Sequence, residues 1–242
     1  MKRIALLTGM MLVLMVATAF AGGINMSWND CGVAGVANKA FACDTNTGNH
    51  DIFTSFDPPQ AAAQIHESDQ IVDLQAAGGI LPDWWQFKNA GSCRAFEMST
   101  PSVYPASCFN TWGGNDSPGF AAYLVTANTP SMPPDRARIM ASVFIPGATA
   151  VAVTPGTEYY AMTMRIRSGK TVGAGSCAGC QVAVCLVLSN ITLHDVNGDL
   201  FSIGNPLSRN FITWQGGAVG GGCPGATPAI NQTWGRVKAI YR

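Results

Sequence analysis

Residues 158–167 read EYYAMTMRIR, and the alternation in this stretch decides the fold class. Successive side chains of a β-strand point to opposite faces, so a period of two separates a buried face from an exposed one. The apolar face of this stretch carries Tyr160, Met162, Met164 and Ile166. Arg165 and Arg167 fall on the other face. The pattern predicts a half-buried strand whose two arginines point to solvent.

Similar patterns recur along the chain and predict about ten to twelve short strands. Residues 136–145 alternate in the same way, and residues 181–193 form the longer apolar run typical of a strand covered on both faces. Asn197-Gly198 then predicts a tight hairpin turn. Further strands are predicted at 24–28, 40–43, 52–56, 71–75, 85–88, 94–98, 120–127, 200–203, 211–215 and 234–241. Only residues 60–68 favour a helix, and a short one.

Many short strands separated by Gly, Pro and Asn, with almost no helix, are typical of two packed antiparallel sheets. We therefore expect an all-β, antiparallel β-sandwich of jelly-roll-like topology, braced by disulfides. No repeat and no long low-complexity linker interrupts residues 22–242, and we expect them to form a single domain.

The N-terminal residues 1–21 have the layout of a secretory signal peptide. Lys2 and Arg3 precede an apolar run over residues 4–17, and Ala19-Phe20-Ala21 supplies the small residues of a cleavage site. We expect a secreted protein, extracellular or periplasmic. No later apolar run approaches the roughly 20 residues that a membrane helix needs, so we expect no membrane insertion after the signal is removed.

The cysteines all follow the predicted signal peptide, and they are Cys31, Cys43, Cys93, Cys108, Cys177, Cys180, Cys185 and Cys223. An even number of thiols in an exported protein favours disulfides. The Cys177-x-x-Cys180 pair also resembles half of a zinc site or a redox motif. Disulfides are favoured over a zinc site and over a redox motif, because the protein is expected in an oxidising compartment and these cysteines lie among predicted strands.

Spacing favours two local disulfides, Cys31–Cys43 and Cys93–Cys108. Cys180 and Cys185 cannot bond across an extended strand, because about 16 Å would separate atoms that need to lie within about 7 Å. Cys223 is expected to pair with Cys177, Cys180 or Cys185, which would fix the preceding glycine-rich run to the sheet.

Charge is sparse, at 12% of residues, with 14 cations balancing 14 anions. A typical soluble domain has about a quarter of its residues charged. No basic run follows the signal peptide, which excludes nucleic acid as an expected partner. A surface rich in Gly, Ala, Ser, Thr and Asn suits close packing against a neighbour, so self-association is expected among the partners.

Aromatic residues beside polar ones are the candidate ligand-binding residues: Asp83, Trp84, Trp85 and Trp112. An exposed indole can stack on the apolar face of a sugar while carboxylates and amides bind its hydroxyls. The competing interpretation is a core role. Adjacent Trp84 and Trp85 on a strand would point to opposite faces, so at least one would be buried.

No pattern identifies a catalytic residue, a metal site or a cofactor. The three histidines, His50, His66 and His194, share no ligand spacing, and no G-x-S-x-G elbow occurs. Residues 195–199 resemble the start of a calcium loop, but they lack its glycine at position 6 and its glutamate at position 12. A hairpin turn is the favoured interpretation.

Three function classes remain. The leading one is a secreted non-enzymatic structural or surface-interaction protein that self-assembles through charge-poor faces. The alternative is a carbohydrate-binding β-sandwich module that binds a surface glycan. The third is a secreted hydrolase, which would need two carboxylates across a cleft. Glu67, Glu97 and Glu158 are among its candidates, and sequence alone does not pair them.

Overall fold

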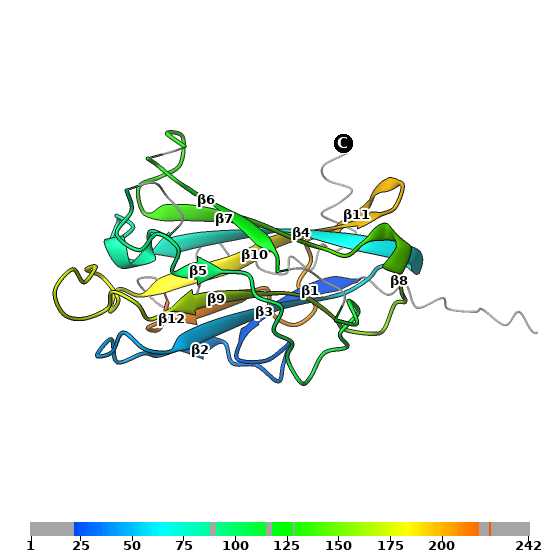
Figure 1. The fold of residues 1–242 in the computed structure, drawn as a ribbon, viewed down its shortest axis with the longest axis horizontal. Helices are drawn as coiled ribbons and strands as arrows, with labels where there is room; N and C mark the ends of the chain where they lie inside the picture. Colours follow the sequence, from blue (N-terminus) through cyan, green and yellow to red (C-terminus); the bar gives the residue numbers. More distant parts are fainter. Residues whose placement is uncertain (1–21, 88–90, 115–117, 128, 218–222, 224–242) are drawn as a thin grey trace, which may run out of the picture.

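The structure, a computed structural model, describes residues 22–87, 91–114, 118–127, 129–217 and 223. Within them the chain forms two β-sheets and two single-turn 3-10 helices, η1 (Asp83–Trp85) and η2 (Gly147–Thr149). Figure 1 shows β4, β6 and β7 in one layer and β1, β3 and β9 in the other. The expected signal peptide and the expected strand at 234–241 lie outside the described residues.

The small sheet has the strand order β1-β3-β9-β5, and all of its pairings are antiparallel. Its strands are β1 (Gly23–Trp28), β3 (Asn49–Asp57), β9 (Tyr159–Arg167) and β5 (Met98–Ser99). The strand predicted at residues 158–167 is therefore confirmed as β9, and it lies between β3 and β5.

The large sheet has the order β2-β12-β10-β4-β7-β6. These strands are β2 (Asn38–Lys39), β12 (Phe211–Trp214), β10 (Val184–Asp195), β4 (Ala62–Ala76), β7 (Arg136–Phe144) and β6 (Phe120–Val125). Two further strands extend it, because β11 (Gly198–Ile203) pairs with β10 and β8 (Val151–Val153) pairs with β4. Among the named strands of the described residues, only β12 and β2 pair in parallel. The predicted all-β antiparallel sandwich is confirmed.

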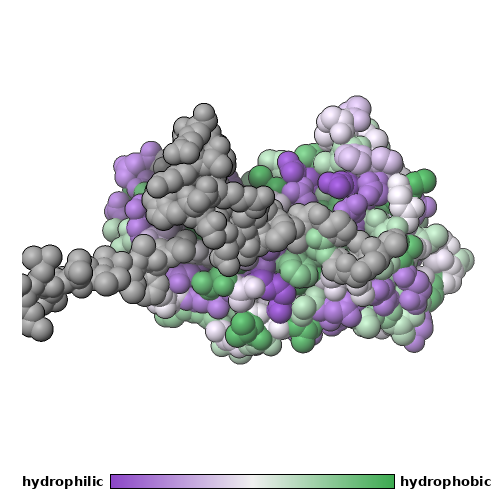
Figure 2. Space-filling view, turned by 180° about the vertical axis from the view of Figure 1, so that it is seen from behind, coloured by the Kyte–Doolittle hydropathy of each residue, from purple (hydrophilic) through white to green (hydrophobic). Residues whose placement is uncertain are grey.

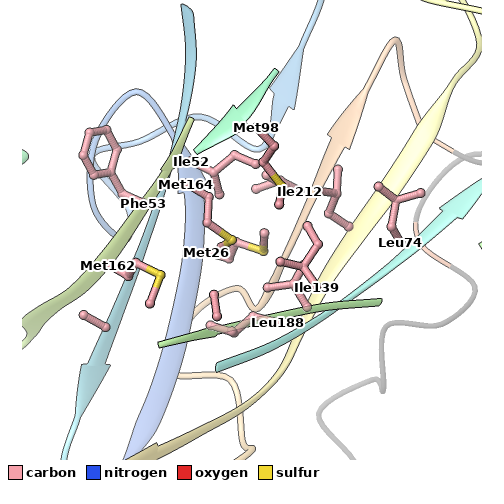
Figure 3. Close-up of a cluster of buried hydrophobic side chains, with 14 of the residues drawn as sticks. Met26, Ile52, Phe53, Leu74, Met98, Ile139, Met162, Met164, Leu188 and Ile212 are labelled. Atoms are coloured by element: carbon pink, nitrogen blue, oxygen red, sulfur yellow. The ribbon is translucent and has the colours of Figure 1, made fainter. Parts of the chain in front are cut away.

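The core lies between the sheets and combines methionines with branched aliphatic residues (Figure 3). Met26, Met98, Met162 and Met164 come from the small sheet. They face aliphatic side chains of the large sheet, which include Leu74, Ile139, Leu188 and Ile212. An unbranched thioether adapts to irregular gaps, so methionine suits the contact of two sheets that twist independently.

Four disulfides join the eight cysteines: Cys31–Cys108, Cys43–Cys180, Cys93–Cys177 and Cys185–Cys223. The predicted bracing is confirmed, as is the pairing of Cys223 with a member of the 177–185 group. The two predicted local pairings, Cys31–Cys43 and Cys93–Cys108, are wrong. Three of the four bonds join residues 77 to 137 positions apart, because the sandwich brings distant loops together.

The hairpin at Asn197-Gly198 is confirmed, since it joins β10 to β11. The helix expected at residues 60–68 is wrong, because residues 62–68 begin β4 and pair with β8 and β10. The strands expected at 40–43, 85–88 and 94–98 are also not formed: only Met98 lies in a strand, and residue 88 lies outside the described part. These three segments surround Cys43 and Cys93, where disulfides hold irregular loops.

Candidate interaction face

A loop lies along the β9 edge of the small sheet, where Phe109 N–H donates to the Glu158 carbonyl at 3.2 Å and Tyr160 N–H donates to the Phe109 carbonyl at 2.9 Å. The indole Nε1 of Trp112 donates a hydrogen bond to the Ala161 carbonyl of β9 at 3.0 Å. The ring of Phe109 packs edge-on against Tyr159, with 5.6 Å between the ring centres. The disulfide Cys31–Cys108 fixes this loop in place. The outer face of the small sheet is closed as well, because Asn25, Ser27 and Ser55, which point away from the core, are buried.

The outer face of the large sheet carries a shallow groove of about 450 Å³ across β6, β7, β4 and β10, which we call the sheet groove. Its lining combines apolar and polar side chains, and comprises Asp69, Gln70, Ile71, Phe120, Ala122, Met140, Ala141, Ser142, Asn190, Thr192 and His194. Figure 2 shows the molecule from behind, with hydrophilic and hydrophobic residues interspersed over the visible face.

Large apolar side chains of the sheet groove point to solvent. Phe120 is 61% exposed and Met140 is 45% exposed, and Phe144 at the end of β7 is 44% exposed. They occupy the positions of β6 and β7 that alternate with buried core residues such as Tyr123 and Ile139. Burying these side chains against a partner would release apolar surface from water, at about 25 cal/mol for each Å².

Carboxylates on β4 border this apolar surface. Asp69 lies 3.0 Å from Nε2 of His194, and Glu67 accepts a hydrogen bond of 2.9 Å from the Ser142 hydroxyl. Neither carboxylate forms an ion pair with a lysine or an arginine in the described part of the chain. The groove therefore offers negative charge beside exposed apolar side chains.

A second hollow of about 350 Å³ lies on the same outer face, toward the other end of β4 and β7. Here Arg138 binds Asp73 through two hydrogen bonds of 2.7 and 3.1 Å, and the Ser189 hydroxyl donates a third to Asp73 at 2.7 Å. The hydrogen bonds that Arg138 donates to Asp73 raise the pKa of Arg138 above its usual value. Cys185 also lines this hollow, so its disulfide with Cys223 lies on the outer face.

The tryptophans expected as ligand-binding residues are fully buried. Trp84, Trp85 and Trp112 each have 0% exposure, and of the four candidates only Asp83 lies at the surface. The Trp84 indole donates to the Thr171 hydroxyl at 3.0 Å, as expected of a core indole that needs a partner. Their burial agrees with the competing interpretation, a core role; Trp84 and Trp85 lie on the 3-10 helix η1 and both turn inward, and do not point to opposite faces as they would on a strand. They offer no ring face to a sugar.

His50, Glu158 and Glu67 lie in separate parts of the sandwich. Burial, with weaker contributions from Lys39 and Arg94, lowers the pKa of His50 to about 4. Its Nε2 lies 3.1 Å from the Ser168 hydroxyl, and both side chains are buried. Glu158 accepts hydrogen bonds from Asn25 and Ser55 on the small sheet, whereas Glu67 lies on the outer face of the large sheet. These two acids do not share a cleft.

The calcium-like stretch is the turn of the β10–β11 hairpin. The Asp195 carboxylate accepts a hydrogen bond of 2.7 Å from the backbone N–H of Asn197, which closes the turn locally. Over the described residues, no group of three or more His, Cys, Asp or Glu side chains is arranged to hold a metal ion. In the same part of the chain, no helix is long and apolar enough to span a membrane.

Sequence reasoning missed the residues of the sheet groove, although a signal was present. In residues 136–145 the alternation assigns Ala137, Ile139, Ala141 and Val143 to the core. The opposite face then carries Met140 and Phe144, which are large apolar residues where polar ones are usual. Such side chains on the solvent face of a strand indicate an interaction surface.

Comparison with known proteins gives little more. No protein-family model and no curated protein matches the chain. Solved structures that do match include a cohesin module from a family 33 glycoside hydrolase of Clostridium perfringens, at 9% identity and a TM-score of 0.34, covering 81% of this chain and 97% of that one. A type II cohesin domain from the cellulosome of Acetivibrio cellulolyticus matches at 9% identity and a TM-score of 0.36. The match covers 79% of this chain and 95% of that one. Likenesses with such low TM-scores carry no functional argument.

Proposed function

We propose that this chain is an exported, non-enzymatic interaction module whose sheet groove binds a polypeptide segment bearing both apolar and basic side chains. The observation that carries the proposal is the juxtaposition of exposed Phe120 and Met140 with the carboxylates Glu67 and Asp69.

The apolar part of the groove supplies the affinity. Aromatic residues and methionine are enriched at protein interfaces, where a few buried anchors carry most of the binding energy. Phe120 and Met140 lie on neighbouring strands, with Phe120 opposite Ser142 and Met140 opposite Ala122 in the β6–β7 pairing. A partner side chain placed between them would contact both.

The carboxylates supply the selectivity. An Arg or Lys of the partner would be attracted to Asp69 and Glu67, and an acidic partner would be repelled. Of the two outer faces, that of the small sheet is closed, because its side chains Asn25, Ser27 and Ser55 are buried. This leaves the large sheet as the face on which a partner can dock.

The setting supports a role outside the cytoplasm. Four disulfides are typical of proteins from oxidising compartments, and the expected signal peptide would direct the chain there. An interaction module needs no cofactor and no paired acids, in keeping with a site built from apolar side chains and single carboxylates.

The test uses a short fluorescent peptide of alternating valine and lysine, measured by anisotropy against the full chain. We expect a Kd of about 0.1 mM, which corresponds to a small interface with partial apolar burial. A peptide of alternating valine and glutamate, and one of alternating serine and lysine, should bind at least about tenfold more weakly.

The double variant Phe120→Ser, Met140→Ser should reduce binding of the valine–lysine peptide at least about tenfold. Phe109→Ser is the matched control, because Phe109 is 61% exposed like Phe120 but lies beside β9 of the small sheet. Equal binding of all three peptides, or equal loss in the control variant, would show that the sheet groove is not the binding surface.

A further inference from the structure

We infer that the outer face of the large sheet selects a polypeptide segment with opposite charges at its two ends. A basic side chain lies over the sheet groove, and an acidic one lies about 20 Å away in the second hollow, beside Arg136. This inference rests on the proposed function, because it defines the partner of the same face. The register of β4 and β7 and the position of Arg136 carry it.

The strands β4 and β7 present one continuous row of opposed side chains on this face, which we call the outer row. Its pairs are Glu67–Phe144, Asp69–Ser142, Ile71–Met140, Asp73–Arg138 and Gln75–Arg136. The residues that alternate with them, such as Val72, Leu74 and Ile139, are buried in the core. The outer row therefore joins the sheet groove to the second hollow in one line, and six positions of β4 separate Asp69 from Gln75.

The charge of the outer row changes sign along its length. The groove end carries the carboxylates Glu67 and Asp69. Apolar side chains follow, and then Asp73 and Arg138 form an ion pair of 2.7 Å that cancels their two charges. Arg136 lies beyond this pair, at the other end of the row. A segment extended along the row thus meets an acidic end and a basic end.

Arg136 is available to a partner. It is exposed, it lines the second hollow, and in the described part of the chain it forms no ion pair. Two acids lie near it, and each has another partner. Asp73 binds Arg138, and Asp135 accepts a hydrogen bond of 2.9 Å from Gln75 without lining the hollow. A guanidinium can donate two parallel hydrogen bonds to one carboxylate, so Arg136 suits an acidic side chain.

The second hollow suits the rest of such a side chain as well. Its volume is about 350 Å³, and Leu124 and Val187 line it together with Arg136. The methylene groups of a glutamate would lie against these apolar residues, with the carboxylate at the guanidinium. A lysine in the same place would be repelled. The charge preference at this end is therefore opposite to that of the sheet groove.

Three peptides with uncharged termini and a fluorescent label test the inference: Lys-Thr-Val-Thr-Val-Thr-Glu, and the same sequence ending in Gln or in Lys. Alternate side chains of an extended peptide share one face, so its end residues lie six positions apart, as Asp69 and Gln75 do. By anisotropy against the full chain, the Glu-ended peptide should bind at least about threefold more tightly than the Gln-ended one, and the Lys-ended peptide most weakly. Removing one Thr-Val unit should abolish the advantage of Glu, because the carboxylate then meets the neutral Asp73–Arg138 pair.

The variant Arg136→Glu should reverse the order, so that the Lys-ended peptide binds most tightly. Arg167→Glu is the matched control, because Arg167 is an exposed arginine at the end of β9 in the small sheet. In this control the order should stay as in the unchanged chain. A reversal in both variants would assign the effect to the net charge of the protein, and would overturn the inference.

The remaining outcomes separate this inference from the proposed function. Equal, measurable binding of the three peptides would sink the selection for opposite charges and leave the groove's function standing, as would an order that Arg136→Glu does not change. No binding of these peptides or of the valine–lysine peptide would sink the proposed function as well. A dimer of the chain that the peptides dissociate, seen by sedimentation, would show that a second copy occupies this face, and would overturn the inference.

Discussion

The guanidinium of Arg94 lies 3.7 Å from the centre of the Trp84 ring, and Arg94 is fully buried. Its Nη1 donates to the Trp84 carbonyl at 2.8 Å, and its Nη2 donates to the carbonyl of Arg167 at the end of β9. Burial lowers the pKa of Arg94 to about 10, so the side chain remains charged at neutral pH. Arg94 thus ties the 3-10 helix η1 to the small sheet through a cation–π contact.

Replacing this buried cation should be costly. We expect Arg94→Ala to lower the free energy of unfolding by about 3 kcal/mol, because it opens a cavity beside Trp84 and removes two hydrogen bonds to backbone carbonyls. The exposed Arg136→Ala should change it by less than about 0.5 kcal/mol. Urea denaturation with the disulfides intact measures both, and equal effects would contradict the role given to Arg94.

The buried His50 should make stability depend on pH. In the folded chain its pKa is about 4, against 6.5 when exposed, so the unfolded chain binds an extra proton between these values. The contribution of the neutral His50 to the free energy of unfolding is therefore fully present above pH 6.5, and it is lost as the pH falls toward 4. We expect a loss of about 2 kcal/mol between pH 6.5 and 5.

The variant His50→Gln should flatten this dependence, although it lowers stability at every pH. Gln60→Ala is the control, since Gln60 is exposed and carries no titratable group, so the slope should stay intact. Denaturation curves at pH 5, 6 and 7 distinguish the two variants. A slope that survives in His50→Gln would assign the titration to another group.

The buried tryptophans should matter for stability. We expect Trp85→Ala to lower the free energy of unfolding by about 3–5 kcal/mol, as for a large aromatic residue removed from a core. Trp85 packs against Trp84 and Trp214 with ring centres 5.2 and 5.6 Å apart. Asp83→Ala, its exposed neighbour, should have almost no effect. A Trp85→Ala protein of unchanged stability would show that the ring is not in the core.

Disulfide mapping checks the crosslinks. Non-reducing peptide mass spectrometry should find the bond Cys31–Cys108, and with it Cys43–Cys180, Cys93–Cys177 and Cys185–Cys223. No peptide should join Cys31 to Cys43 or Cys93 to Cys108. Either local bond as the main product would require the loops around β2 and β5 to be arranged differently.

Strands with a clear period of two could be predicted from sequence, because one buried face is enough to specify them. The strand predicted at 158–167 is observed as β9 (Tyr159–Arg167), and the one predicted at 136–145 is observed as β7 (Arg136–Phe144). The disulfide pairings could not be predicted, because Cys43 and Cys180 meet only after distant loops have been placed. Trp84 and Trp85 were misplaced for a related reason. A single 3-10 turn, set by tertiary packing, points both rings inward where a strand would have separated them.

The residues of the sheet groove likewise could not be predicted as one surface from the sequence. Alternation placed Met140 on the face opposite the core, but only the neighbouring strands bring it beside Phe120 and Asp69. An interaction face on a sheet is assembled across strands, so its members are scattered in the sequence.

The most direct measurement is an NMR titration of the full chain, with labelled methionine methyl groups, against the valine–lysine peptide. The account predicts that the Met140 signal shifts, while those of the core residues Met26, Met98, Met162 and Met164 stay in place. Met140→Leu assigns the signal. A Met140 signal that does not move at saturating peptide, or shifts confined to other methionines, would contradict the claim that the outer face of the large sheet is the binding surface.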